Sequence, residues 1–483
     1  MSRFSPAGPF RVRFAPSPTG FLHLGGLRTA LFNYLISRKF PGSRFILRIE
    51  DTDQSRVVPD AVEQLISTLT WTGLSFDEGP GKESVHGPFV QSQRLPLYKD
   101  HVEDLLETGA AYRCFCSRQR LETLRSTMPY GHYDRFCRRI PLQESKFRLS
   151  CGESHTVRFK VPDGAFDESV LHQDLVYGRI LSGLSKVDDA ILMKSDGFPT
   201  YHFANVVDDH LMKVNLVIRG QEWIASTPLH ILLYKAFNWD LPLFAHLPLL
   251  VNSSGAKLSK RQGDAHVAHY IEAGYLPEAL INFVAYLGWA PSRELRSEVM
   301  TLDELAQNFS LAELNTADAT VNLQKLNWLN RQHMQQRLRN EYLVGDLLAA
   351  VKAQVRGITN DSYEDEYLKK VMSLMSERIN VPCDLAKLAP YFFHDPVYSS
   401  QECTEMWKKV QSKQNRDGII NFLSQFEHDP ISAIDANKSM GMLSRVILTG
   451  LSIGPSIRDV ASILGPDVCK RRVGLFRDAF NLR

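Results

Sequence analysis

With 483 residues, 44% of them hydrophobic and 23% charged, the chain has the composition of a globular protein and exceeds the length of one hydrophobic core, so we expect roughly three or more domains. No run approaches the roughly 18 apolar residues that a membrane helix requires, and seven scattered cysteines do not fit a disulfide framework, which favours a reducing compartment. A net charge of +2 excludes a strong overall field for nucleic acid, which would have to be bound by local basic patches.

The first ninety residues alternate between extended and helical patterns. In chain order, the expected elements are an extended Phe10–Ala15, a helix from His23 to about Phe40, an extended Phe45–Glu50, and a helix from Pro59 to just before Gly73. This order predicts a parallel, nucleotide-binding sheet. The unpaired amides and the dipole at the start of the first helix form an anion site, and Gly25 and Gly26 let a nucleotide approach closely.

The pattern changes between about residues 91 and 194. A helix is expected over Pro96–Thr108, followed by a cysteine-bearing stretch and an alternating segment at His155–Val161. We interpret this part as an α/β insertion that splits the nucleotide-binding domain. That domain resumes over residues 195–240, where the expected elements are a helix at Thr200–Leu211, an extended Val214–Arg219 and a helix near Ser226.

The last part of the chain, from about residue 336, has no strand signals. Amphipathic helical patterns dominate there, for example over Tyr342–Val355 and Tyr367–Ile379. We therefore expect a helical domain over residues 336–483. Between it and the nucleotide-binding domain lies a region, residues 241–335, that carries the polar loop Lys257–Arg261.

Two short segments indicate phosphate chemistry. Residues 14–25 read Phe-Ala-Pro-Ser-Pro-Thr-Gly-Phe-Leu-His-Leu-Gly, and residues 257–261 read Lys-Leu-Ser-Lys-Arg. With Phe45–Asp53, Ser195–His210 and Val217–Trp223 they resemble the motifs of bacterial-type glutamyl-tRNA synthetases, in the class I aminoacyl-tRNA synthetase family. Several motifs in order are far more specific than any single one. The resemblance implies an α/β plus all-α fold: a Rossmann-type catalytic domain over 1–90 and 195–240, an acceptor-stem-binding insertion over 91–194, a stem-contact region over 241–335 and a helical anticodon-binding domain over 336–483.

The chemistry of the implied first step is attack by a carboxylate on the α-phosphate of ATP, which requires alignment and charge neutralisation but no covalent nucleophile. His23, at a helix start, can donate to the phosphates, and Lys257 and Lys260 can reach them as mobile cations; these three are the catalytic candidates. Ser259 is expected to hold the loop by local hydrogen bonds. By resemblance, Gly25 and Glu222 also contact ATP, and Mg²⁺ accompanies the nucleotide.

The residues for the amino acid fit glutamate. Arg13 and Arg219 stand at strand ends that face one cleft, where a guanidinium can bind a carboxylate through two parallel hydrogen bonds. Glu50 can bind the ammonium group. The resemblance adds four more pocket residues, Ala15, Ser17, Tyr201 and Asn205.

A cysteine pattern raises the question of zinc. Cys114-x-Cys116 followed by Cys137-x-Arg139 resembles the zinc knuckle of some bacterial members of the family, but arginine has no lone pair to give a metal. His132 or Cys151 could take its place. We expect a metal-free relic, so zinc is not a predicted cofactor.

The predicted function is ATP-dependent activation of L-glutamate and its transfer to the 3′ end of tRNA-Glu, with tRNA-Gln left open as a second substrate. The alternatives are glutamylation of a modified tRNA base by a shorter enzyme, and a non-catalytic RNA-binding paralogue. Arg378 is the candidate for an anticodon contact. The family expectation is a monomer. The slightly basic chain resembles mitochondrial members, so the expected location is the mitochondrial matrix after removal of a presequence, with the bacterial cytoplasm as the alternative.

Overall fold

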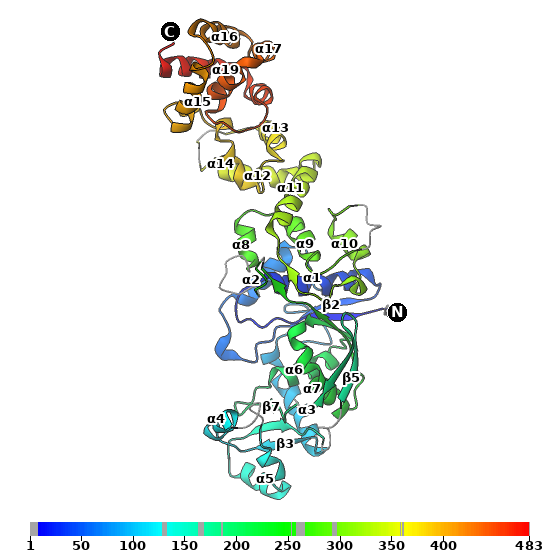
Figure 1. The fold of residues 1–483 in the computed structure, drawn as a ribbon. Helices are drawn as coiled ribbons and strands as arrows, with labels where there is room; N and C mark the ends of the chain where they lie inside the picture. Colours follow the sequence, from blue (N-terminus) through cyan, green and yellow to red (C-terminus); the bar gives the residue numbers. More distant parts are fainter. Residues whose placement is uncertain are drawn as a thin grey trace. The chain divides into compact units, whose positions relative to one another are not determined.

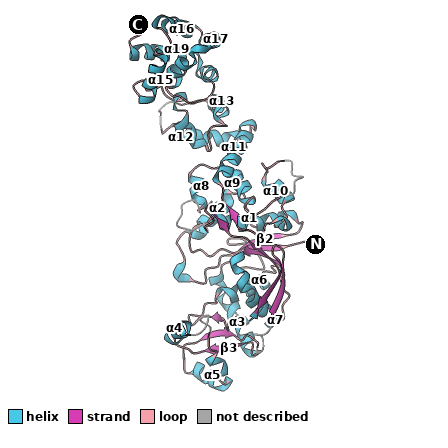
Figure 2. Ribbon diagram, in the orientation of Figure 1, coloured by secondary structure: helices cyan, strands magenta, loops and turns pink. Residues whose placement is uncertain are grey.

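The structure, a computed structural model, describes residues 8–127, 133–162, 169–184, 187–252, 254–256, 266–291, 297–357, 359 and 362–482. The chain forms two compact units. The mixed unit comprises the residues up to Tyr270 together with Leu280–Asn322, and the helical unit comprises Ile271–Ala279 together with the residues from Leu323 onward. Figure 2 shows the strands, in magenta, in the mixed unit. Among the described helices, none combines the length and the apolar character that crossing a bilayer requires.

The mixed unit begins with a strand–helix–strand element. Strand β1 (Arg11–Phe14) pairs in parallel with β2 (Arg44–Leu47), and helix α1 (Leu24–Lys39) connects them. Helix α1 is apolar on most of its circumference and is therefore buried on most of it. His23 and Phe40, the predicted ends of this helix, are its two extended capping residues. Helix α2 (Ala61–Trp71) follows Asp60, close to the predicted start.

The mixed unit also contains a four-stranded sheet with the strand order β6-β5-β9-β8. Strands β8 (Leu216–Gly220) and β9 (Leu243–Leu247) are parallel, β5 (Ser169–Asp174) joins β9 in parallel, and β6 (Gly178–Gly183) is antiparallel to β5. The sheet is thus mixed, whereas β1 and β2, for which the sequence predicted a parallel arrangement, are parallel. Helices α6 (Tyr201–Leu211) and α7 (Thr227–Ala236) pack in the same core (Figure 1).

This sheet extends past the domain boundaries predicted from sequence. Strands β5 and β6 lie inside the predicted insertion, residues 91–194, and β9 lies in the predicted stem-contact region, residues 241–335. The pairing of Asp174 with Phe244 joins segments 70 residues apart. Local patterns carry no information about such pairing, because a strand of either domain has the same period of two.

The part of the chain between α2 and α6 also forms a separate antiparallel sheet, β3 (Ala111–Cys114), β4 (Thr156–Phe159) and β7 (Ile191–Met193). Its helices are α3 (Leu95–Glu107), α4 (Arg118–Thr127) and α5 (Leu142–Ser150). The remaining elements of the mixed unit and of its junction with the helical unit are β10 (Leu250–Val251), α8 (Val267–Glu272), α9 (Pro277–Ala285), α10 (Leu302–Asn308) and β11 (Ala319–Thr320).

The described part of the helical unit contains helices and no strand, as predicted (Figure 1). From α11 onward its helices are α11 (Leu323–Arg339), α12 (Val344–Val355), α13 (Asp365–Met375), α14 (Leu385–Leu388), α15 (Gln401–Gln411), α16 (Arg416–His428), α17 (Pro430–Ala436), α18 (Gly441–Thr449) and α19 (Ile457–Phe480). Residue 336, the predicted start of the helical domain, lies within α11. The unit has its own apolar core. Arg472 is buried in it and satisfied by Asp395 and by the carbonyls of Tyr391 and His394.

Candidate active site

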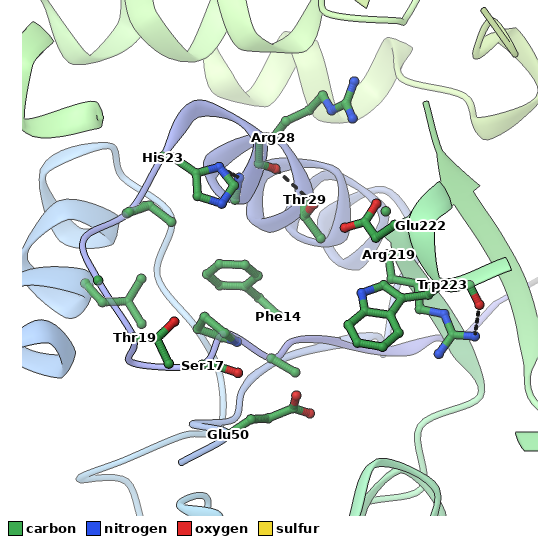
Figure 3. Close-up of a pocket in the computed structure, with 18 of the residues that line it drawn as sticks. Phe14, Ser17, Thr19, His23, Arg28, Thr29, Glu50, Arg219, Glu222 and Trp223 are labelled. Atoms are coloured by element: carbon green, nitrogen blue, oxygen red, sulfur yellow. Dashed lines mark hydrogen bonds between the residues drawn. The ribbon is translucent and has the colours of Figure 1, made fainter. Parts of the chain in front are cut away.

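A cavity of about 840 Å³ opens in the mixed unit between the turn after β1, the start of α1, helix α6 and the end of β8. His23 lies toward one end of this cavity, and Glu50 and Arg219 lie toward the other (Figure 3). Ten of the residues predicted from sequence line it, namely Arg13, Ala15, Ser17, His23, Gly25, Glu50, Tyr201, Asn205, Arg219 and Glu222. Lys257, Ser259 and Lys260 lie outside the described residues, and Arg378 belongs to the helical unit.

His23 has a structural role as a helix cap. It is the N-cap of α1, and its Nδ1 accepts a hydrogen bond from the backbone amide of Gly26, 3.1 Å away. An accepting Nδ1 carries no proton, so in the neutral ring the proton is on Nε2. A Cβ on Gly25 would lie 3.1 Å from the same Nδ1. The glycine therefore makes room for the imidazole, a reason that differs from the nucleotide approach expected from sequence.

Described residues on both sides of Lys257 and Lys260 lie close to the start of α1. Leu250 in β10 lines the cavity. On the other side, His266 pairs with His23 in an antiparallel bridge, and Val267 donates its amide to the Leu22 carbonyl at 2.9 Å. Leu250 and His266 are thus both near the start of α1.

At the end of the cavity that Glu50 and Arg219 line, a buried network joins three guanidinium groups and three carboxylates. Its contacts are Arg48–Glu50 at 3.0 Å, Arg48–Asp209 at 2.7 Å, Arg13–Asp209 at 3.1 Å and Arg94–Asp208 at 2.7 Å. The charges of the network cancel. Burial raises the pKa of Glu50, against the lowering effect of Arg48 and Arg13. A further cation that binds next to Glu50 therefore stabilises its charged carboxylate.

Arg219 differs from these arginines. It is 4% exposed, and among the described residues no carboxylate forms an ion pair with it. Burial lowers the pKa of Arg219, and the Tyr201 phenol opposes that shift. The ring of Tyr201 packs against that of Trp223, with the ring centroids 4.1 Å apart and the ring planes tilted by 32°. A buried guanidinium without a bound carboxylate is costly, so the geometry favours an anionic ligand at this end of the cavity.

Arg28 is another buried cation that lines the cavity. Burial lowers the pKa of Arg28 to about 10, while the Glu222 charge acts in the opposite direction. Arg28 donates to the carbonyls of Leu287, at 3.1 Å, and of Pro248. Glu222 itself is exposed, in the 3-10 turn Gln221–Ser226 that follows β8. A Cβ on Gly220 would overlap its carboxylate.

The three cysteines Cys114, Cys116 and Cys137 converge as the sequence pattern suggested, and their sulfur atoms lie within 4.8 Å of one another. The Tyr133 hydroxyl lies 3.4 Å from both Cys114 Sγ and Cys116 Sγ. It takes the place for which sequence reasoning considered His132, which is outside the described residues, or Cys151, which is exposed and not in the cluster. The three cysteines could hold zinc, for which thiolates are preferred ligands.

Several residues of the site were not singled out from sequence. Arg48 and Asp209 lie inside quoted motifs without an assigned role, and their signal was a charge in an otherwise apolar run. Trp223, His230 and His246 gave no comparable signal. Their roles depend on contacts between separate strands and helices.

The fold and the site together define a class I aminoacyl-tRNA synthetase. Residues 9–328 match the family described as tRNA synthetases class I (E and Q), catalytic domain, and residues 333–439 match the family described as anticodon binding domain. Glutamate–tRNA ligase of Chloroherpeton thalassium is 40% identical over 96% of both chains. That of Clostridioides difficile is 37% identical over 97% of this chain and 99% of its own. The crystal structure of a glutamate tRNA ligase from Elizabethkingia meningosepticum in complex with its amino acid has a TM-score of 0.82 and 34% identity, over 96% of this chain and 98% of that one.

The chain belongs to this family and is a bacterial-type glutamate–tRNA ligase, an ATP-using enzyme whose substrates are L-glutamate and tRNA-Glu. The match to the anticodon binding domain does not fit the shorter enzyme that glutamylates a modified tRNA base. The prediction from sequence is therefore confirmed for the fold class, the activity and the bacterial type.

Proposed function

We propose that the cavity binds glutamate and ATP side by side, with the amino acid at Arg219 and the phosphates at the start of α1. The observation that carries this assignment is the buried Arg219, which has no carboxylate ion pair within the described chain. The side-chain carboxylate of glutamate is the expected partner, with Arg13 as the second cation. Glutamine, whose amide cannot accept two charge-assisted bonds, is disfavoured.

Glu50 binds the ammonium group of glutamate in this proposal. Burial raises its pKa, and the incoming cation relieves the cost of the buried carboxylate. Asn205 donates to Glu50 Oε1 at 3.3 Å and keeps the carboxylate turned toward the cavity. Ala15, Ser17 and Tyr201 complete the wall around the amino acid.

The reaction needs no covalent nucleophile. An oxygen of the glutamate α-carboxylate attacks the α-phosphorus, pyrophosphate leaves, and a ribose hydroxyl at the tRNA 3′ end then attacks the carbonyl carbon and releases AMP. His23 donates from Nε2 to the phosphates, with Lys257 and Lys260 as further cations, Ser259 as a loop-holding residue, and Gly25 and Glu222 on the ATP side. Magnesium enters with the nucleotide and neutralises phosphate charge.

The helical unit supplies tRNA recognition in this proposal. Arg378, which is exposed after α13, contacts an anticodon base, and tRNA-Gln is a second substrate to be tested. Arg378→Ala should raise KM for tRNA-Glu and leave pyrophosphate exchange unchanged, with Lys369→Ala as the control on the preceding helix. An unchanged KM for tRNA in Arg378→Ala would remove the residue from the interface.

Zinc is a structural cofactor candidate at Cys114, Cys116, Cys137 and Tyr133. Bound there it would cross-link β3 to the segment around Cys137, and it would take no part in the reaction. The reason for expecting no zinc was the arginine at position 139, and the Tyr133 hydroxyl weakens that reason.

Location and assembly complete the proposal. The slight positive net charge supports the mitochondrial matrix, with bacterial cytoplasm as the alternative, and the enzyme acts as a monomer. Cell fractionation tests the first statement, and light scattering tests the second.

The central test is pyrophosphate exchange and aminoacylation with both amino acids and both tRNAs. We expect exchange with glutamate and roughly 100-fold or more discrimination against glutamine. Arg219→Ala should lose most of that preference. Equal activation of the two amino acids by the unaltered enzyme would remove Arg219 from the proposed role.

A further inference from the structure

The Arg219 guanidinium is held on three sides before any substrate binds. Its acceptors are His246 Nε2, 3.1 Å from Nε, and His230 Nδ1, 3.0 Å from Nη1. Nη2 donates to Thr227 Oγ1 at 2.9 Å and to the Trp223 carbonyl at 3.4 Å. A guanidinium has five N–H donors. Nε–H and both N–H groups of Nη2 are thus engaged by neutral acceptors, and the second N–H of Nη1 remains for a ligand in the cavity that Arg219 lines.

These contacts determine the protonation of both histidines. Arginine can only donate, so the accepting nitrogens of His246 and His230 carry no proton. The other nitrogen of each neutral ring must then donate. His246 Nδ1 lies 2.7 Å from Asp174 Oδ2, and His230 Nε2 lies 3.0 Å from His202 Nδ1. A continuous relay therefore runs from Asp174 through His246, Arg219 and His230 to His202.

The tertiary structure builds this relay from five separate elements. Asp174 ends β5, His246 lies in β9 directly opposite Arg219 of β8, and His230 and His202 come from α7 and α6. Asp174 and His246 are fully buried, and His230 is 1% exposed. Groups so deeply enclosed have little rotational freedom, so the plane of the guanidinium is set in advance.

The Asp174 carboxylate has hydrogen-bond partners on both oxygens. Its Oδ1 accepts the backbone amides of Val176 and Tyr177, each at 2.9 Å, and Oδ2 accepts from His246. A carboxylate in direct contact with Arg219 would compete with the substrate for the same N–H groups. Placed beyond a neutral imidazole, Asp174 instead fixes the tautomer of His246 and leaves the binding edge of Arg219 open.

We propose that Asp174, His246 and His230 are positioning residues that set the preference for glutamate over glutamine by orienting Arg219. The inference rests on the proposed role of Arg219 as the residue that binds the side-chain carboxylate. Without the relay, the guanidinium turns away from the orientation in which its remaining N–H meets the substrate carboxylate, and the advantage of glutamate shrinks.

The test compares His246→Leu, which removes the acceptor, with His246→Gln, whose side-chain oxygen can accept from Arg219. Pyrophosphate exchange gives kcat and KM for glutamate, glutamine and ATP. We expect His246→Leu to lower the glutamate-to-glutamine ratio of kcat/KM by roughly tenfold or more, through KM for glutamate. KM for ATP should be unchanged, and His246→Gln should recover most of the ratio. His210→Gln, a histidine that stacks on Trp239 instead, is the control.

A ratio that stays within about twofold of the unaltered enzyme overturns the relay, and so does an equal loss of kcat for both amino acids. If His246→Leu does not fold, Asp174→Asn takes its place, because it keeps the volume and removes the charge; an unchanged ratio in that variant has the same meaning. Arg219→Lys distinguishes the role of the relay from the role of Arg219 itself. If it loses selectivity while His246→Leu does not, only the relay fails, and if it keeps selectivity, the proposed role of Arg219 fails with it.

Discussion

Replacement of His23 separates its structural role from its chemical role. The Nδ1 atom caps α1 through Gly26, and the Nε2–H is the proposed phosphate donor. Alanine removes both functions. Asparagine is among the best N-cap residues, so it can accept the same amide while its short side chain cannot reach where Nε2 stood.

The two functions have different magnitudes. Loss of an N-cap costs about 1 kcal/mol of stability, and the glycines at 25 and 26, poor helix formers in the first turn of α1, make the cap valuable. Loss of one donor to transition-state charge costs about 2.7–4 kcal/mol, or roughly 100- to 1000-fold in rate. His23→Ala should therefore be less stable and slow, whereas His23→Asn should be equally slow with nearly unchanged stability.

The assays are urea unfolding and pyrophosphate exchange at saturating ATP and glutamate. Thr29→Ser, a substitution in the same helix, serves as the control for both. If His23→Asn retains activity within about threefold of the unaltered enzyme, the histidine is only a helix cap and the phosphate assignment is wrong.

Three further predictions concern stability and metal content. Burial lowers the pKa of His202 to about 4, and the pKa values of His230 and His246 also lie below the ordinary 6.5. Below pH 6.5 the unfolded chain therefore binds more protons than the folded chain, so the urea midpoint should decrease as the pH is lowered through this range. A urea midpoint that does not change with pH would contradict buried neutral histidines. Asp208→Asn leaves the buried Arg94 without its ion-pair partner and should lower the free energy of unfolding by about 3–5 kcal/mol. Glu122→Gln, at an exposed ion pair, should not change it measurably. Equal urea midpoints for the two variants would show that the buried pair is not needed for stability. Elemental analysis of the unaltered enzyme, purified without chelator, should find zinc. Cys137→Ser should lose this zinc, and Tyr133→Phe should bind it more weakly. If the unaltered enzyme contains no metal, the result supports the metal-free cysteine cluster expected from sequence.

The sequence by itself determined the local elements and the positions of the motif residues. Helix α1 begins and ends where the pattern places it, and ten predicted residues line one cavity, because helix capping, periodicity and the turn after β1 are properties of neighbouring residues. The switch to a helical second half is equally local.

Only the tertiary structure decided which distant groups meet. The pairing of β5 with β9, the Tyr133 hydroxyl among three thiols, and the relay from Asp174 to Arg219 each join segments that are separate in the chain. The sequence pattern around a buried charged residue is the same whichever distant residue becomes its partner. Its partners are selected by the packing of whole elements, since a buried charge without hydrogen-bond partners would cost a large share of the small net stability of the fold.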